Sequence, residues 1–176
     1  MKFNIPIMNE VKKELVVGNK IPDFTALSSV GPLNFKNWAK GHWTILFLKP
    51  CLFSNNFDDN LFIAKNRMFL HHKKIRLIAF ANSFFESNQW GKNITQTSIP
   101  LSNPIIYDID KMLSKKFTGS ENEAYLESMN RFYIVDNNSQ IRQIITFQKE
   151  VSIDLNDIYM VINSLRDTSF HKVLRE

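Results

Sequence analysis

The chain has 176 residues, of which 44% are hydrophobic and 22% are charged; this composition is typical of a globular domain and excludes disordered and fibrous classes. A chain of this length buries about two-thirds of its unfolded surface, so it needs no disulfide or metal for stability. Its single cysteine excludes an internal disulfide, a cysteine-rich zinc site and a two-thiol redox cycle within one monomer. The net charge of +5 is too mild to indicate nucleic-acid binding by itself.

The ends of the chain show no targeting or spanning segment. Charged residues interrupt the amino-terminal sequence MKFNIPIMNEVKKEL before any apolar run reaches signal-peptide length. No apolar run approaches the roughly 20 residues of a spanning helix. We therefore expect a cytoplasmic protein that binds neither membrane nor nucleic acid. No repeat or linker appears, so we expect one domain over residues 15–168, an amino-terminal extension over 1–14 and a carboxy-terminal tail over 169–176.

The first half of the chain alternates between strand and helix patterns. Residues 43–48 form a short apolar, β-rich run that Pro50 stops, which is typical of a buried strand. Residues 57–71 carry apolar side chains at helical spacing and predict an amphipathic helix. Residues 75–81, with the sequence IRLIAFA, predict a second buried strand.

A polar helix is expected over residues 84–93 and a short strand over residues 105–107. Asp110 is a candidate cap for a helix that runs to Phe117 and that Gly119 ends.

The last part of the chain predicts a hairpin and a helix. Residues 132–135 and 141–147 are two strand-like runs, and the turn-forming residues 136–139 separate them. Residues 154–165 place apolar side chains on one helical face. The whole pattern predicts an α/β protein with a mixed sheet. In such sheets the site lies at the carboxyl ends of strands, which points to the loop after Leu48.

Short segments in the same order resemble a known family along residues 15–168: Val17-Gly-Asn-Lys-Ile-Pro-Asp-Phe24, Val30-Gly31 with Phe35 and Trp38, Ile45-Leu-Phe-Leu-Lys-Pro-Cys-Leu-Phe-Ser54, Tyr107-Asp108, Phe132-Tyr-Ile-Val-Asp136, Ile145-Thr-Phe147 and Asn156 to Leu165. Together they resemble peroxiredoxins, the alkyl hydroperoxide reductase and thiol-specific antioxidant family, and the last segment is similar to the closing helix of the one-cysteine branch. The resemblance implies a thioredoxin-like fold with a central mixed sheet flanked by helices.

The active-site motif of that family is degenerate here. The family pattern is Pro-x-x-x-Thr-x-x-Cys; Pro50 fits it, Ser54 replaces the threonine, and Phe57 stands where the peroxidatic cysteine belongs. The two family arginines correspond to Asn130 and Ile153. Arg131 is offset by one residue, which on a strand turns its side chain to the opposite face.

These replacements are physically consistent with one another. A peroxidatic sulfur reacts as a thiolate, which nearby guanidinium groups stabilise together with the developing oxyanion. Two arginines retained without that thiolate would be buried unpaired charges, which cost several kcal/mol. Neutral residues at all three positions predict a pocket with no catalytic residue for the family mechanism.

Cys51 is the only candidate thiol. Cys51-Leu-Phe-Ser54 has the CxxS form of the thioredoxin-type motif at a strand-to-helix junction, where a thiol can have a lowered pKa. It lies six residues before the peroxidatic position, where the family usually carries a small packed residue. Cys51 is therefore open to three interpretations: a structural residue, a reactive thiol, or a ligand.

Other candidate residues have simpler alternatives. His71, His72, Lys73 and Lys74 complement the end of a predicted helix, and adjacent histidines rarely chelate one metal. The aromatic residues Phe53, Phe57, Phe84 and Phe85 serve either core packing or an apolar contact surface. Asp58 and Asp59 either favour the first helical turn or act as an acid or base. We expect no cofactor and no metal.

Three functional hypotheses follow. The first is a pseudoenzyme that has lost peroxidase chemistry and acts by binding a protein, either a second copy or another partner. The second is a thiol-dependent peroxidase or oxidoreductase that uses Cys51, and the third is a scaffold for a small ligand. We also expect a homodimer, for which the strand over residues 141–147 offers an edge if it lies outermost in the sheet.

Overall fold

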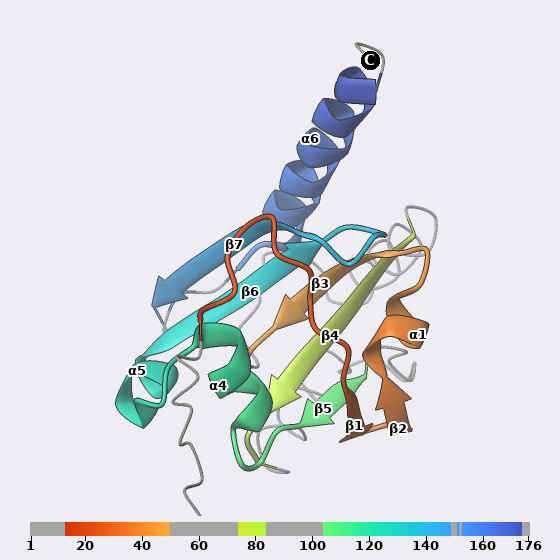
Figure 1. The fold of residues 1–176 in the computed structure, drawn as a ribbon. Coiled ribbons are helices and arrows are strands. Elements are labelled where there is room, and N and C mark those ends of the chain that lie inside the picture. The colour runs from red at the N-terminus through yellow and green to blue at the C-terminus, as the bar shows by residue number, and fades with distance from the viewer. Residues whose placement is uncertain (1–12, 50–73, 84–103, 149–150, 152, 174–176) are drawn as a thin grey trace, which may run out of the picture.

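The computed structural model describes residues 13–49, 74–83, 104–148, 151 and 153–173 (Figure 1). Its centre is one seven-stranded mixed sheet with the strand order β2-β1-β5-β4-β3-β6-β7. The strands are β1 (Thr25–Ser28), β2 (Gly31–Asn34), β3 (Trp43–Phe47), β4 (Ile75–Ala81), β5 (Ile105–Tyr107), β6 (Met129–Val135) and β7 (Ile141–Gln148). The predicted α/β class with a mixed sheet is confirmed.

Strand β3 lies inside the sheet, between β4 and β6. It pairs in parallel with β4 and antiparallel with β6. All five of its residues are buried, as expected for an apolar run that is covered on both faces. Its side chains alternate: Ile45 and Phe47 belong to the core on one face, and Leu46 belongs to the core on the other.

Helices cover both faces of the sheet (Figure 1). The long helix α6 (Leu155–Val173) packs Ile158 and Ile162 against the face that carries Ile45. On the other face, α1 (Phe35–Ala39) and α4 (Met112–Thr118) contribute Phe35 and Phe117 to the second core. The short helix α5 (Glu123–Ser128) lies beside β6 at the same side as α4 (Figure 1).

The hairpin predicted near the carboxyl terminus is confirmed. Strands β6 and β7 pair antiparallel, from Met129 opposite Gln148 to Val135 opposite Ile141. Asp136 stabilises the turn because its carboxylate accepts the backbone N–H groups of Asn138 and Gln140, at 2.9 and 3.0 Å. Strand β7 is the outermost strand at this edge.

A second hairpin forms the opposite edge of the sheet. Strands β1 and β2 pair with Ser28 opposite Gly31, which leaves a two-residue turn. Gly31 has a φ of +97°, a backbone conformation that favours glycine. The Ser28 hydroxyl donates to the Gly31 carbonyl at 2.6 Å and fixes the turn.

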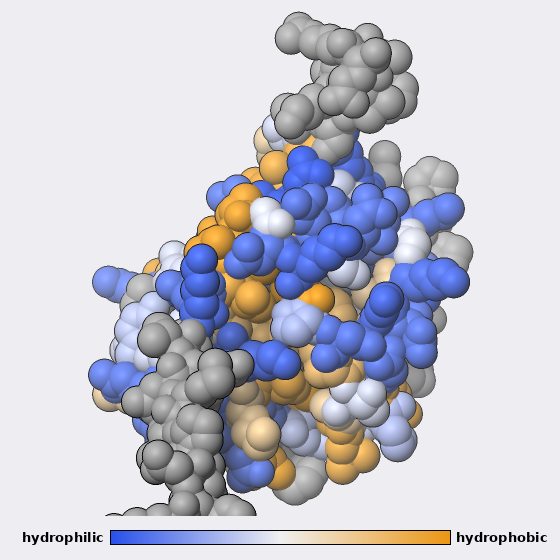
Figure 2. Space-filling model, in the orientation of Figure 1, coloured by the Kyte–Doolittle hydropathy of each residue, from blue (hydrophilic) through white to orange (hydrophobic). Residues whose placement is uncertain are grey.

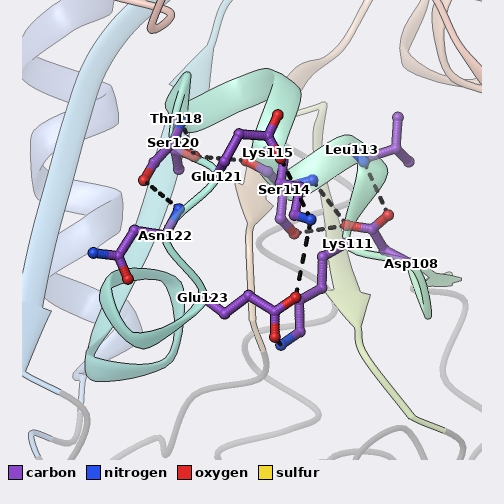
Figure 3. A network of polar contacts seen from close by, with 10 residues as sticks. All are labelled: Asp108, Lys111, Leu113, Ser114, Lys115, Thr118, Ser120, Glu121, Asn122 and Glu123. Carbon is purple, nitrogen blue, oxygen red and sulfur yellow. Dashed lines mark hydrogen bonds and ion pairs between the residues drawn. The ribbon is translucent and has the colours of Figure 1, made fainter.

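The amino-terminal cap of α4 differs from the prediction. Asp110 is exposed, whereas Asp108 is 5% exposed and accepts the backbone N–H groups of Leu113 and Ser114 at 2.9 and 2.8 Å (Figure 3). The Ser114 hydroxyl also donates to Asp108, at 2.7 Å. The prediction of Asp110 was wrong because Lys111 adopts a left-handed φ of 54°, which starts the helix one residue later. The predicted end at Gly119, with its φ of 66°, is confirmed.

The closing helix is longer than the sequence pattern indicated. The prediction covered residues 154–165, whereas α6 continues to Val173. The apolar face ends at Leu165, but no glycine or proline follows it to stop the helix. Figure 1 shows the later turns of α6 reaching beyond the sheet.

The remaining predicted elements lie outside the described residues. These are the helices expected over residues 57–71 and 84–93. Within the described part of the chain, no helix is both long and apolar enough to cross a bilayer.

Asp108→Ala should lower the free energy of unfolding by about 2–3 kcal/mol, because it leaves one buried and one partly buried N–H group of α4 without their acceptor. The measurement is chemical denaturation followed by circular dichroism. The matched control is Asp110→Ala, which should change stability by less than about 0.5 kcal/mol because Asp110 is exposed. Equal losses for the two variants would contradict this cap.

Candidate functional site

The candidate site begins where β3 ends. Strand β3 leads through Leu48 to Lys49, at the carboxyl edge of the parallel pair β3 and β4. The predicted site residues Pro50, Cys51, Ser54 and Phe57 follow directly and lie outside the described residues. The same holds for the other candidates of that region, namely Phe53, Asp58, Asp59, His71, His72, Lys73, Phe84 and Phe85.

Asn130 lies near the start of β6, on the face that α6 covers. It is 3% exposed and stands opposite Phe147 of β7. Side chains alternate along a strand, so Asn130 shares its face with Phe132 and Ile134, which belong to the core under α6. An amide at this position offers hydrogen bonds but no charge.

Ile153 approaches the same face from the segment before α6. It is half-buried and packs against the core that contains Phe132 and Ile158. The two positions that the resemblance assigns to arginines are thus on one side of the sheet, and both are neutral. Whether Phe57 meets them stays a prediction.

Arg131 points to the other side of the sheet, as its offset predicted. Its Nε donates to Thr146 Oγ1 at 3.1 Å and its Nη2 donates to the Tyr125 hydroxyl at 2.8 Å. Its Nη1 is bonded to the carboxylate of Glu14, which is 117 positions away in the chain. The guanidinium therefore joins the amino-terminal segment, α5 and the hairpin.

These contacts raise the pKa of Arg131, whereas burial raises the pKa of its neighbour Tyr133. Burial disfavours the arginine charge, but bonds to Tyr133 and Glu14 outweigh that effect and raise the pKa of Arg131. Burial also raises the pKa of Tyr133, although Arg131 acts in the opposite direction. A permanently charged guanidinium is thus fixed on the face away from Asn130.

The face that carries Asn130 has an arginine at its far end. Arg166 of α6 lies over the ring of Trp43, with 5.1 Å between the guanidinium carbon and the ring centroid. Trp43 starts β3, so Arg166 lies about 16 Å along the strand from Leu48 at the strand rise of about 3.3 Å per residue. Arg166 therefore lies far from the carboxyl end of β3, where the candidate site begins.

A small pocket that the sequence did not predict lies at the carboxyl ends of β3 and β4, on the face away from α6. Its lining includes Lys49, Lys111 and Arg131, with Leu48 and Leu126 among the apolar wall residues. These cations are far apart in the sequence, so no local motif could have revealed them. In the described part of the chain, no cluster of histidine, cysteine and acidic residues is arranged to hold a metal.

Comparisons with known proteins agree on one family. No family model matches the chain. A peroxiredoxin of Thermoplasma volcanium is 29% identical over 156 residues, which cover 86% of this chain and 75% of that protein. Peroxiredoxin 2 of Caldanaerobacter subterraneus is 26% identical over 163 residues, which cover 90% of this chain and 73% of that protein.

Solved structures of the same family share the fold. A yeast mitochondrial 1-Cys peroxiredoxin has a TM-score of 0.70 and 22% identity, over 88% of this chain and 78% of that one. AhpC of Mycobacterium bovis has a TM-score of 0.65 and 15% identity, over 88% of this chain and 99% of that one. The predicted thioredoxin-like fold is thereby confirmed, and the chain is a homologue of the peroxiredoxins.

Proposed function

We propose that this protein is a peroxiredoxin-like pseudoenzyme that has lost thiol peroxidase chemistry and acts by binding a protein, in the first instance a second copy of itself. The observation that carries the proposal is the pair Asn130 and Ile153. Both positions lie on the face under α6 and neither supplies a charge.

The absence of charge at these positions matters because the peroxidase reaction needs a thiolate. A cysteine thiol has an ordinary pKa of about 8.5, and each pKa unit of lowering takes about 1.4 kcal/mol of differential stabilisation. Guanidinium groups give that stabilisation and also favour the developing oxyanion. Phe57 has no sulfur, and Arg131 is held on the opposite face by Glu14, Tyr125 and Thr146.

The proposal makes a prediction about catalysis. The wild-type protein should show no thiol-dependent peroxidase activity, and Phe57→Cys alone should not restore it, because an apolar site raises a thiol pKa. The triple change Phe57→Cys, Asn130→Arg, Ile153→Arg should exceed the single change at least roughly tenfold. The measurement is peroxide consumption with dithiothreitol as reductant.

The control for this assay is Cys51→Ser. It should leave the wild-type background unchanged. Rapid turnover by the wild-type protein that Cys51→Ser abolishes would contradict the pseudoenzyme proposal and would support a thiol enzyme that uses Cys51.

A stability measurement tests the site without peroxide. Asn130→Arg alone should lower the free energy of unfolding by about 3 kcal/mol or more, because it places a charge at a position that is 3% exposed. Adding Phe57→Cys should recover part of that loss at alkaline pH, where the thiolate forms. Gln148→Arg is the matched control at an exposed position of β7 and should cost less than about 0.5 kcal/mol. Equal losses of unfolding free energy for Asn130→Arg and Gln148→Arg would contradict the buried environment of Asn130.

The proposed dimer uses the edge of β7. Of the described residues of β7, only the first, Ile141, forms backbone hydrogen bonds with the amino-terminal segment. The Gly18 N–H donates to the Ile141 carbonyl, and the Ile141 N–H donates to the Asn19 carbonyl, both at 2.8 Å. Figure 2 shows apolar surface along the boundary between α6 and β7. Nearby in the chain, Val151 and Met160 are 47% and 71% exposed. An outer strand and exposed apolar residues both favour association with another chain.

Sedimentation velocity should show a dimer at micromolar concentration. The double change Val151→Lys, Met160→Lys should shift the protein to a monomer, because charges replace exposed apolar residues in the segment that follows β7 and on α6. The matched control is Leu27→Lys, Val30→Lys, at residues that are 57% and 62% exposed beside the opposite edge of the sheet; it should keep the dimer. A monomeric wild-type protein, or a dimer lost only in the control, would contradict the β7 interface.

A further inference from the structure

Three cations lie at the edge of the sheet where β3 and β4 begin. Lys40 directly follows α1, Lys74 directly precedes β4, and Arg76 is the second residue of β4. The backbone N–H of Trp43 donates to the Lys74 carbonyl at 3.0 Å and joins the starts of the two strands. Figure 1 shows the loop after α1 entering β3 beside the start of β4. We call Lys40, Lys74 and Arg76 the cationic edge; it lies at the opposite ends of these strands from the candidate site.

Arg76 rests on an aromatic ring and has no anionic partner. Its guanidinium carbon lies 5.3 Å from the ring centroid of Trp38 in α1, and both side chains are half-buried. Attraction to the ring holds the guanidinium in place but uses none of the N–H donors in its plane. In the part of the chain that the structure describes, these donors have no acceptor.

The neighbouring polar groups do not satisfy Arg76. Thr44 stands opposite Arg76 in the parallel pair, and its buried hydroxyl has no hydrogen-bond partner among the described residues. Asp136 directly follows β6, but its carboxylate binds Arg142 and the backbone of its own turn. Burial lowers the pKa of Arg76, and no described acid offsets that effect.

The two lysines of the cationic edge are also unpaired. Both are exposed, and neither forms an ion pair with any of the described residues. At the other ends of the strands, by contrast, Lys111 and Arg131 pair with glutamates. Like charges that share one edge repel one another. An anion bound at this edge would relieve a repulsion that the free protein retains.

The composition of the cationic edge favours a protein as the source of that anion. Arginine and tryptophan are the side chains most enriched at interface hot spots, which lie at the centre of an interface inside a polar rim. Here a half-buried arginine lies on a half-buried tryptophan, and exposed lysines lie nearby. A guanidinium binds a carboxylate through two parallel N–H donors. Three cations are few for a nucleic acid, whose binding proteins often contact about 6–10 phosphates.

We propose that the cationic edge is the docking site for an acidic segment of a partner protein. One carboxylate of that segment binds the Arg76 guanidinium over Trp38, and neighbouring carboxylates lie near Lys40 and Lys74. This surface is separate from the dimer edge proposed for β7, because β6 lies between β3 and β7 in the sheet. The inference also does not depend on the loss of peroxidase chemistry, which concerns the opposite ends of the strands.

The test is titration of the ¹⁵N-labelled full chain with a peptide of alternating glutamate and serine, at constant ionic strength. A peptide with glutamine in place of glutamate is the uncharged probe. The backbone amides of Lys40 and Arg76 and the indole N–H of Trp38 should shift and saturate with the acidic peptide only. Arg76→Gln should weaken binding about tenfold, as expected for loss of a charge-assisted hydrogen bond. Lys40→Gln should weaken it about two- to threefold, the range of an exposed ion pair.

The matched control is Lys116→Gln, which removes the same charge from an exposed lysine of α4, a helix that lines the pocket at the other ends of β3 and β4. It should leave peptide binding unchanged. Shifts that rise without saturation, or equal weakening by Lys40→Gln and Lys116→Gln, would overturn the proposal. Tighter binding of an oligothymidylate than of the acidic peptide at the same resonances would overturn the choice of a protein partner. If Arg76→Gln fails to fold, the comparison of the two lysine variants still decides the question.

Discussion

The side chains of β6 alternate between two packed faces of the sheet, and the positions of the candidate site residues depend on this alternation. Phe132 and Ile134 must lie under α6, and Tyr133 and Val135 must face the other core. With that register fixed by β3 and β7, Asn130 is committed to the α6 face and Arg131 to the opposite one. A slip of one residue would exchange the two, but it would also move Phe132 and Ile134 into the opposite core and bring Tyr133 and Val135 under α6.

The two faces of the sheet differ in charge at this end of β6. The face under α6 carries the neutral positions Asn130 and Ile153, where the resemblance to peroxiredoxins implies arginines. The other face carries Arg131, which burial and bonding keep charged. The guanidinium bonds Thr146, Glu14 and Tyr125, and the sheet itself lies between it and Asn130. The proposed loss of peroxidase chemistry rests on these neutral residues.

Polar contacts at the ends of elements complete the architecture. Asp108 directly follows β5 and caps α4, so one buried carboxylate ties a strand to the helix that follows it. Lys111 and Lys115 then link α4 to acidic residues at the start of α5 and before it (Figure 3). These contacts are mostly exposed and contribute little individually. Their effect is to set the position of α5, whose Tyr125 holds the Arg131 guanidinium.

The sequence by itself determined the strands β3 to β7, the hairpin turn at Asp136, the stop of α4 at Gly119 and the face to which Arg131 points, because all of these follow from side-chain periodicity and local turn chemistry. Tertiary structure decided the rest. Asp108 replaced Asp110 as the cap through the backbone conformation of Lys111. The pairing of Arg131 with Glu14 joins positions 117 residues apart, and such contacts arise only when the sheet brings distant segments together.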